Sequence, residues 1–143
     1  MASTYPLKIR NYDTSKVVSV PPASAAVIVP GDLVTIESNE LCLLDSADDD
    51  QYLCGVSLGR SASGSTTRID VCYGWVKATA QMLSGTYRFG ANVMYYNTSD
   101  NGTLTAASGE DIGYVIDDSS VARTTADVVI DAFNLSKFWD INS

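Results

Sequence analysis

The stretch Arg68-Ile69-Asp70-Val71-Cys72-Tyr73-Gly74-Trp75-Val76-Lys77-Ala78 is the longest regular segment of this chain and decides its fold class. Its large apolar side chains recur at every second position, at Ile69, Val71, Tyr73 and Trp75. Because side chains alternate across a strand, this period places them on one face of a sheet, opposite Arg68, Asp70 and Gly74. A glycine inside a strand packs nothing and costs chain entropy, so Gly74 predicts a bulge or bend.

Short apolar runs continue on both sides of this segment and indicate an all-β chain. Pro30-Gly31-Asp32 has the pattern of a type II turn, and Asn101-Gly102 is a hairpin signal. No 3.6-residue apolar period is sustained, so the pattern allows at most one short helix, around residues 78–83. The predicted fold is a compact β-sandwich or β-barrel-like domain of the β-tulip type. We expect its strands at residues 16–20, 25–29, 33–37, 41–44, 52–58, 66–80, 92–96, 104–106, 112–117 and 127–133.

Composition excludes several classes of function. The chain has 143 residues, no histidine, 9 basic and 17 acidic residues, and a formal net charge of −8. Without histidine there is no Ser-His-Asp or Cys-His catalysis and no zinc site that needs imidazole. The excess of acidic residues argues against binding to duplex DNA, which needs Lys and Arg to replace counterions. We therefore expect a protein that is not an enzyme and makes no direct contact with nucleic acid.

Three motifs that suggest chemistry have simpler interpretations. Residues 55–59 (GVSLG) match the nucleophile elbow around Ser57, but that serine would need a base that the chain lacks. Residues 97–102 (NTSDNG) share a glycine with calcium-binding loops, although Asn-Gly favours a hairpin turn. Asp48, Asp49 and Asp50 offer oxygens to a hard cation, but three adjacent acids more often form a solvated loop tip.

The three cysteines, Cys42, Cys54 and Cys72, each lie in an apolar or alternating run without C-x-x-C spacing. We interpret them as packing residues rather than metal or redox groups, and we predict neither a metal nor a cofactor. Two carboxylates acting on a glycosidic bond remain the enzymatic alternative, because 17 acidic residues offer many pairs and none stands out.

Residues 1–24 are predicted to form an extended N-terminal arm, because their three prolines resist helix formation. This arm is basic, with Lys8, Arg10 and Lys16 against Asp13 alone. By contrast, all the charged residues between positions 31 and 50 are acidic. The arm either reaches a neighbouring molecule or frays. Its first residues contain no apolar secretory core, and no run approaches the roughly 20 apolar residues that span a bilayer. We expect a soluble protein made in a cytoplasm, without membrane contact.

The rest of the chain is predicted to comprise a β domain at residues 25–133 and an aromatic C-terminal tail at residues 134–143. Phe138 and Trp139 give the tail two interpretations. It either completes the core as a last strand, since aromatic side chains bury readily, or anchors an interface, where Trp and Phe are enriched.

Several segments of the β domain occur in a distinctive order. They are VIVPGDLV (27–34), LCGV (53–56), YGWV (73–76), GANVMYY (90–96), NGTLT (101–105), IGYV (112–115) and DVVI (127–130). In order and spacing they resemble the small capsid decoration, or cement, proteins of tailed bacteriophages, over most of the chain.

This resemblance implies a structural protein without enzymatic activity, located in the virion on the outer surface of the capsid head. Its partner would be the major capsid protein, whose contacts it would stabilise as a homotrimer at local three-fold positions, with a dimer as the alternative. An arm lying on the capsid lattice is common in the family. The candidate capsid-contact residues are therefore Lys8, Arg10, Lys16, Phe138 and Trp139.

A second interpretation is a carbohydrate- or receptor-binding β module, such as a domain of a phage fibre or adhesin. Such a module would present aromatic side chains on loops. The candidates are Tyr5, Tyr12, Tyr52 and Tyr87, although packing in the interior would explain most of them.

Overall fold

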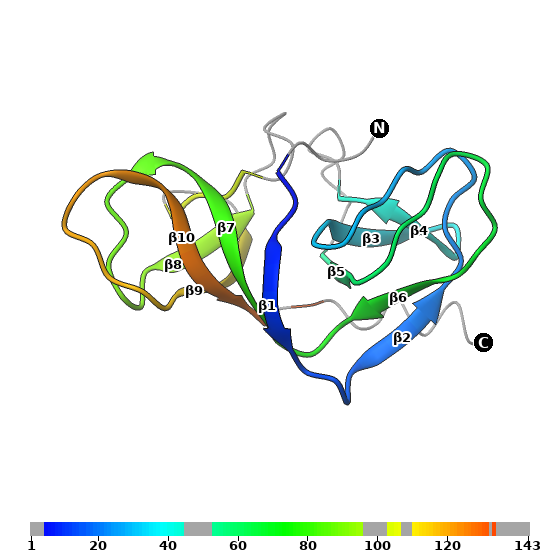
Figure 1. Ribbon diagram of the computed structural model, residues 1–143, viewed down its shortest axis with the longest axis horizontal. Helices are drawn as coiled ribbons and strands as arrows, with labels where there is room; N and C mark the ends of the chain where they lie inside the picture. Colours follow the sequence, from blue (N-terminus) through cyan, green and yellow to red (C-terminus); the bar gives the residue numbers. More distant parts are fainter. Residues whose placement is uncertain (1–4, 45–52, 96–102, 107–109, 132, 134–143) are drawn as a thin grey trace.

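The computed structural model describes residues 5–44, 53–95, 103–106, 110–131 and 133 (Figure 1). Sheet A contains β1 (Lys8–Tyr12), β7 (Val76–Gly85), β10 (Arg123–Ile130), β9 (Glu110–Val115) and β8 (Asn92–Tyr95), in that order. Sheet B contains β2 (Val17–Val20), β6 (Ile69–Cys72), β5 (Gly55–Ser57), β3 (Leu33–Glu37) and β4 (Glu40–Leu43), in that order. All regular elements of the described residues are strands, so the all-β prediction is confirmed. The two antiparallel sheets pack together as a β-sandwich, and each keeps two edge strands within the described chain.

The predicted strand at residues 66–80 is two strands that belong to different sheets. β6 lies in sheet B and β7 in sheet A, and Gly74 lies between them, as the predicted bend requires. The bend changes which alternate positions are buried. Before it the odd-numbered Ile69 and Val71 are buried, whereas after it the even-numbered Val76 is buried. Trp75, expected on the apolar face, is consequently 38% exposed.

The chain crosses from one sheet to the other at residues 73–75, between β6 and β7, and a second crossing runs beside this one. β1 of sheet A leads through residues 13–16 into β2 of sheet B, and both crossings lie at the lower centre of Figure 1. The amide of Asp13 donates to the carbonyl oxygen of Trp75 (2.9 Å), and the amide of Tyr73 donates to that of Lys16 (2.9 Å). The buried Cys72 thiol contacts the carbonyl oxygens of Asp13 (3.7 Å) and Trp75 (3.6 Å), so backbone and side chain hold the two crossings together.

The prediction of an arm outside the β domain at residues 1–24 is wrong for its described part. β1 pairs with β7 and β2 with β6, so this extended segment supplies an edge strand to each sheet. The prolines that suggested an arm lie just outside these strands, at Pro6 before β1 and at Pro21 and Pro22 after β2. β1 itself was not predicted, because its sequence KIRNY contains a single aliphatic residue.

The short helix expected around residues 78–83 is instead the centre of β7. Ala78, Ala80 and Met82 are buried, whereas the residues between them are partly exposed or exposed, which is the alternation of a strand. The helix propensity of alanine is overridden because β7 is paired on both sides, with β1 and β10. Two predicted strands are reduced to isolated bridges, which include Ile28 with Ser61 and Leu104 with Met82.

The Val29–Asp32 turn has the predicted type II character. Gly31 adopts a φ of +93°, and the Asp32 carboxylate accepts a hydrogen bond from the Val29 amide (2.8 Å). The Leu7 amide donates to the carbonyl oxygen of Gly31 (2.8 Å), and a Cβ on Gly31 would lie 1.9 Å from the Leu7 oxygen. Glycine is therefore needed both for the turn and for the close approach of the segment that precedes β1.

Two apolar clusters form the core. The larger joins the sheets, packing Leu33, Val56 and Cys72 of sheet B with residues such as Ala78 and Val128 of sheet A. The smaller lies within sheet B, where the Pro22–Leu41 bridge brings the segment after β2 to the outer edge of β4. Cys54 and Cys72 are buried and Cys42 is half-buried, in agreement with packing roles. Burial and the nearby Glu37 and Glu40 raise the Cys42 pKa to about 11, which keeps its thiol protonated at neutral pH.

Replacing Gly74 with alanine tests the importance of the crossing. A Cβ at Gly74 would lie 2.7 Å from Asp13 Oδ2, 2.8 Å from Asp13 Cβ and 2.8 Å from Lys16 Cβ, so the two crossings must separate. We expect Gly74→Ala to lower the free energy of unfolding by about 1–3 kcal/mol in urea denaturation. The control is Gly59→Ala, whose Cβ meets an Ile69 methyl group at 3.3 Å. Equal losses for the two variants would show that the crossing is not tightly packed.

Candidate interaction surface

Two loops meet at one end of sheet A. β7 ends at Gly85 and β8 begins at Asn92, while β9 ends at Val115 and β10 begins at Arg123. Because β7 pairs with β10 and β8 pairs with β9, both antiparallel, residues 86–91 and 116–122 lie at the same end of sheet A, on the left in Figure 1 and away from the crossings. We call these two segments the distal loops.

The first distal loop contains a tight turn with Phe89 near its tip. The Ala91 amide donates to the carbonyl oxygen of Arg88 (3.0 Å), and Gly90 has a φ of +84°, as in a type II turn. Two further backbone hydrogen bonds of 2.8 Å join the turn to β9, from the Gly90 amide to Val115 and from the Val115 amide to Ala91. The backbone of Phe89 is therefore fixed on both sides.

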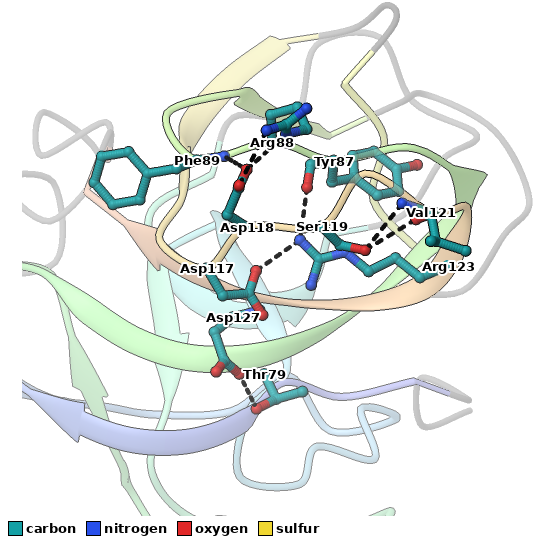
Figure 2. A network of polar contacts seen from close by, with 10 residues as sticks. All are labelled: Thr79, Tyr87, Arg88, Phe89, Asp117, Asp118, Ser119, Val121, Arg123 and Asp127. Atoms are coloured by element: carbon teal, nitrogen blue, oxygen red, sulfur yellow. Dashed lines mark hydrogen bonds and ion pairs between the residues drawn. The ribbon is translucent and has the colours of Figure 1, made fainter.

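Asp118 of the second distal loop holds this turn through three hydrogen bonds (Figure 2). Its Oδ1 lies 2.7 Å from Arg88 Nε and its Oδ2 lies 3.1 Å from Arg88 Nη2, a bidentate pair. Oδ1 also accepts a hydrogen bond from the Phe89 amide (3.0 Å). The Arg88 hydrogen bonds, and then the Phe89 amide, lower the pKa of Asp118 to about 2. Because Arg88 and Asp118 are 62% and 51% exposed, the pair orders the loops more than it stabilises the whole fold.

A second ion pair joins the same loops to β10. Arg123 Nη2 lies 2.7 Å from Asp117 Oδ1 and donates to the carbonyl oxygen of Tyr87 (2.7 Å). Asp117 Oδ2 accepts from the Asp127 amide (3.2 Å), and the hydrogen bond from Arg123 is the main cause of its lowered pKa. Tyr87 is buried, and its hydroxyl donates to the carbonyl oxygen of Leu83. Figure 2 shows this network continuing beneath Phe89 and Val121.

The distal loops carry the two most exposed large apolar side chains of the described residues. Phe89 is 70% exposed and Val121 is 69% exposed. A large aromatic side chain exposed on an ordered backbone is a candidate protein contact, whereas single exposed aliphatic side chains are common on any protein surface. Sequence reasoning missed Phe89, because its partner Asp118 is 29 residues away and their hydrogen bond has no local signature. The one available signal was the placement of Phe89 directly before Gly90.

The predicted basic contact residues do not form a separate charged arm. Lys8 and Arg10 are exposed on edge strand β1, and Lys16 is exposed in the crossing turn. Arg10 Nε and Nη2 both donate to Thr79 Oγ1 (3.1 Å each), and that hydroxyl donates to Asp127 Oδ1 (2.7 Å). Arg10 is thus held over sheet A beside an acidic group. Phe138, Trp139 and the three aspartates at 48–50 lie outside the described residues.

The tyrosine candidates of the receptor-binding interpretation divide into two groups. Tyr87 is buried and Tyr12 packs partly against the core, as expected for interior residues. Tyr5 is 45% exposed, and Tyr52 lies outside the described residues.

Ser57 is buried in β5, and its hydroxyl donates to the carbonyl oxygen of Gly59 (2.8 Å), as a structural serine would. Within the described ranges no three His, Cys, Asp or Glu side chains are grouped to hold a metal ion. In the same residues no helix has the length and apolar character to cross a membrane.

No protein-family model matches the chain, and no curated protein is significantly similar to it in sequence.

Because Asp118 must be ionised to hold the Phe89 turn, we expect the first distal loop to lose its ordered conformation at low pH. Since pairing lowers the pKa from 3.8 to about 2, its contribution is complete above pH 3.8 and is lost as the pH falls through about 2. We expect the Phe89 amide resonance to titrate with a midpoint near the lower value in NMR spectra. The transition should be absent in Asp118→Asn. A midpoint at the ordinary carboxyl value would mean that Asp118 is unpaired in solution.

Proposed function

We propose that this chain is a structural decoration protein that binds the outer surface of a phage head and stabilises contacts between major capsid proteins. The observation that supports a binding role most strongly is the exposed aromatic side chain of Phe89 on a hydrogen-bonded turn at one end of a β-sandwich. The order of the segments that resemble cement proteins selects a capsid as the partner.

Those resembling segments coincide with the main structural features of the fold. VIVPGDLV contains the type II turn that leads into β3, and YGWV contains the crossing between β6 and β7. GANVMYY begins in the Phe89 turn and continues as β8, while IGYV and DVVI lie in β9 and β10. The segments that support the proposal therefore include parts of strands in both sheets and the last two residues of the first distal loop, Gly90 and Ala91.

The proposed stabilisation works through mass action. A protein that binds the assembled lattice better than separated subunits shifts the equilibrium towards the lattice, by an amount that grows with its free concentration. In a homotrimer or dimer, simultaneous attachment of several copies adds avidity without new contacts. A rigid β-sandwich suits this role, because little chain entropy is lost on binding.

A carbohydrate- or receptor-binding module is the second candidate. Tyr5 and Trp75 favour it, since both aromatic side chains are partly exposed and offer faces on which a sugar ring can pack. In this case the chain would belong to a fibre or adhesin.

Co-sedimentation with phage heads that lack the protein separates these two functions. We expect the chain to bind in a copy number close to that of the major capsid protein, and to raise the temperature at which the heads open. The shift should increase with free protein concentration. An unrelated acidic β-protein serves as the control. Binding of only a few copies per particle, or heads of unchanged stability, would contradict a decoration role.

A further inference from the structure

We propose that the distal loops, with Phe89 as the anchor, are the surface that docks into an uncharged apolar pocket on the outer face of the major capsid protein. This inference rests on the proposed function and goes further, because it places the contact at the far end of sheet A. The basic contact residues predicted from sequence, Lys8, Arg10 and Lys16, lie elsewhere, and the other two candidates, Phe138 and Trp139, lie outside the described residues.

The first argument is the ordering of the anchor before binding. The side chain of Phe89 is 70% exposed, whereas its own amide and the amides of Gly90 and Ala91 are all hydrogen-bonded. A large aromatic side chain on a fixed backbone has few degrees of freedom left to lose when it enters a pocket. Aromatic residues in such positions account for much of the energy of protein interfaces.

The second argument is the local balance of charge. The chain has a formal net charge of −8, yet the charged side chains of the distal loops and the first residue of β10 are paired, Arg88 with Asp118 and Arg123 with Asp117. A partner therefore needs no compensating charge at this surface. In Figure 2 Arg88 and Asp118 lie beside the backbone of Phe89 and its ring projects away from them, so they would form a polar margin on one side of the buried ring.

The third argument is the contrast with the basic residues. Lys8 and Lys16 are exposed without an ion pair in the described chain, so a contact through them would rely on long-range attraction. Salt screens such attraction, with a Debye length of about 10 Å at about 0.1 M. Burial of Phe89 in an apolar pocket is not weakened by screening. Salt dependence therefore distinguishes the two surfaces.

The experiment measures binding of the full chain to undecorated heads by sedimentation. The variants are Phe89→Ala, Val121→Ser, Asp118→Asn and the double variant Lys8→Gln/Lys16→Gln. Tyr5→Ala is the matched control, because Tyr5 is an exposed aromatic residue outside the distal loops. Urea denaturation of each variant establishes that it is folded, which we expect because Phe89 and Val121 are exposed.

We expect Phe89→Ala to weaken binding by about tenfold or more, as loss of a central aromatic anchor does. Val121→Ser and Asp118→Asn should weaken binding by smaller factors, the second because it releases the turn while leaving the ring present. Tyr5→Ala and the double lysine variant should bind like the wild type. An increase in salt from about 0.05 M to about 0.5 M should change the wild-type affinity by less than about threefold.

Two outcomes overturn different claims. If the wild-type chain does not bind heads at all, the proposed function is wrong and this docking surface is wrong with it. If the wild type binds but Phe89→Ala binds equally well, the decoration role stands and the docking surface is overturned. A steep loss of binding with salt, together with weak binding of the double lysine variant, would assign the contact to the basic residues instead.

Discussion

The structure depends on the contact between two chain crossings at residues 13–16 and 73–75. At this point the chain passes twice between the sheets, and the hydrogen bonds from Asp13 to Trp75 and from Tyr73 to Lys16 fix the two passages against each other. Gly74 allows the close approach, because any side chain there would collide with the opposite segment. The contact fixes the start of β7, and hence the register of β7 against β1.

The distal loops depend on that register. β7 and β10 pair along most of their lengths. β7 ends at Gly85, which lies opposite Arg123, the first residue of β10. Their pairing brings Arg88 within reach of Asp118 and Arg123 within reach of Asp117. The exposed ring of Phe89 is therefore positioned by contacts that begin in the core at the opposite end of the sheet. The turn that carries Phe89 is therefore ordered within the chain itself.

Local chemistry made part of this structure predictable. The Pro-Gly turn and the bend at Gly74 follow from residues with restricted or exceptional backbone freedom, and short apolar runs identified most strands. Tertiary context decided the rest. The alanines of β7 suggested a helix until their pairing with two neighbouring strands was known, and β1 has too few apolar residues to be recognised alone. Phe89 became a candidate only when folding brought it next to Asp118, a long-range contact that no local pattern encodes.

The most direct test of this account is hydrogen exchange of the chain, free and bound to phage heads. Amides that dock become protected on binding, whereas amides elsewhere keep their exchange rates. The account predicts slower exchange on binding at residues 86–91 and 116–122, with little change at residues 8–20. Protection confined to residues 8–20, with unchanged exchange in the distal loops, would contradict it.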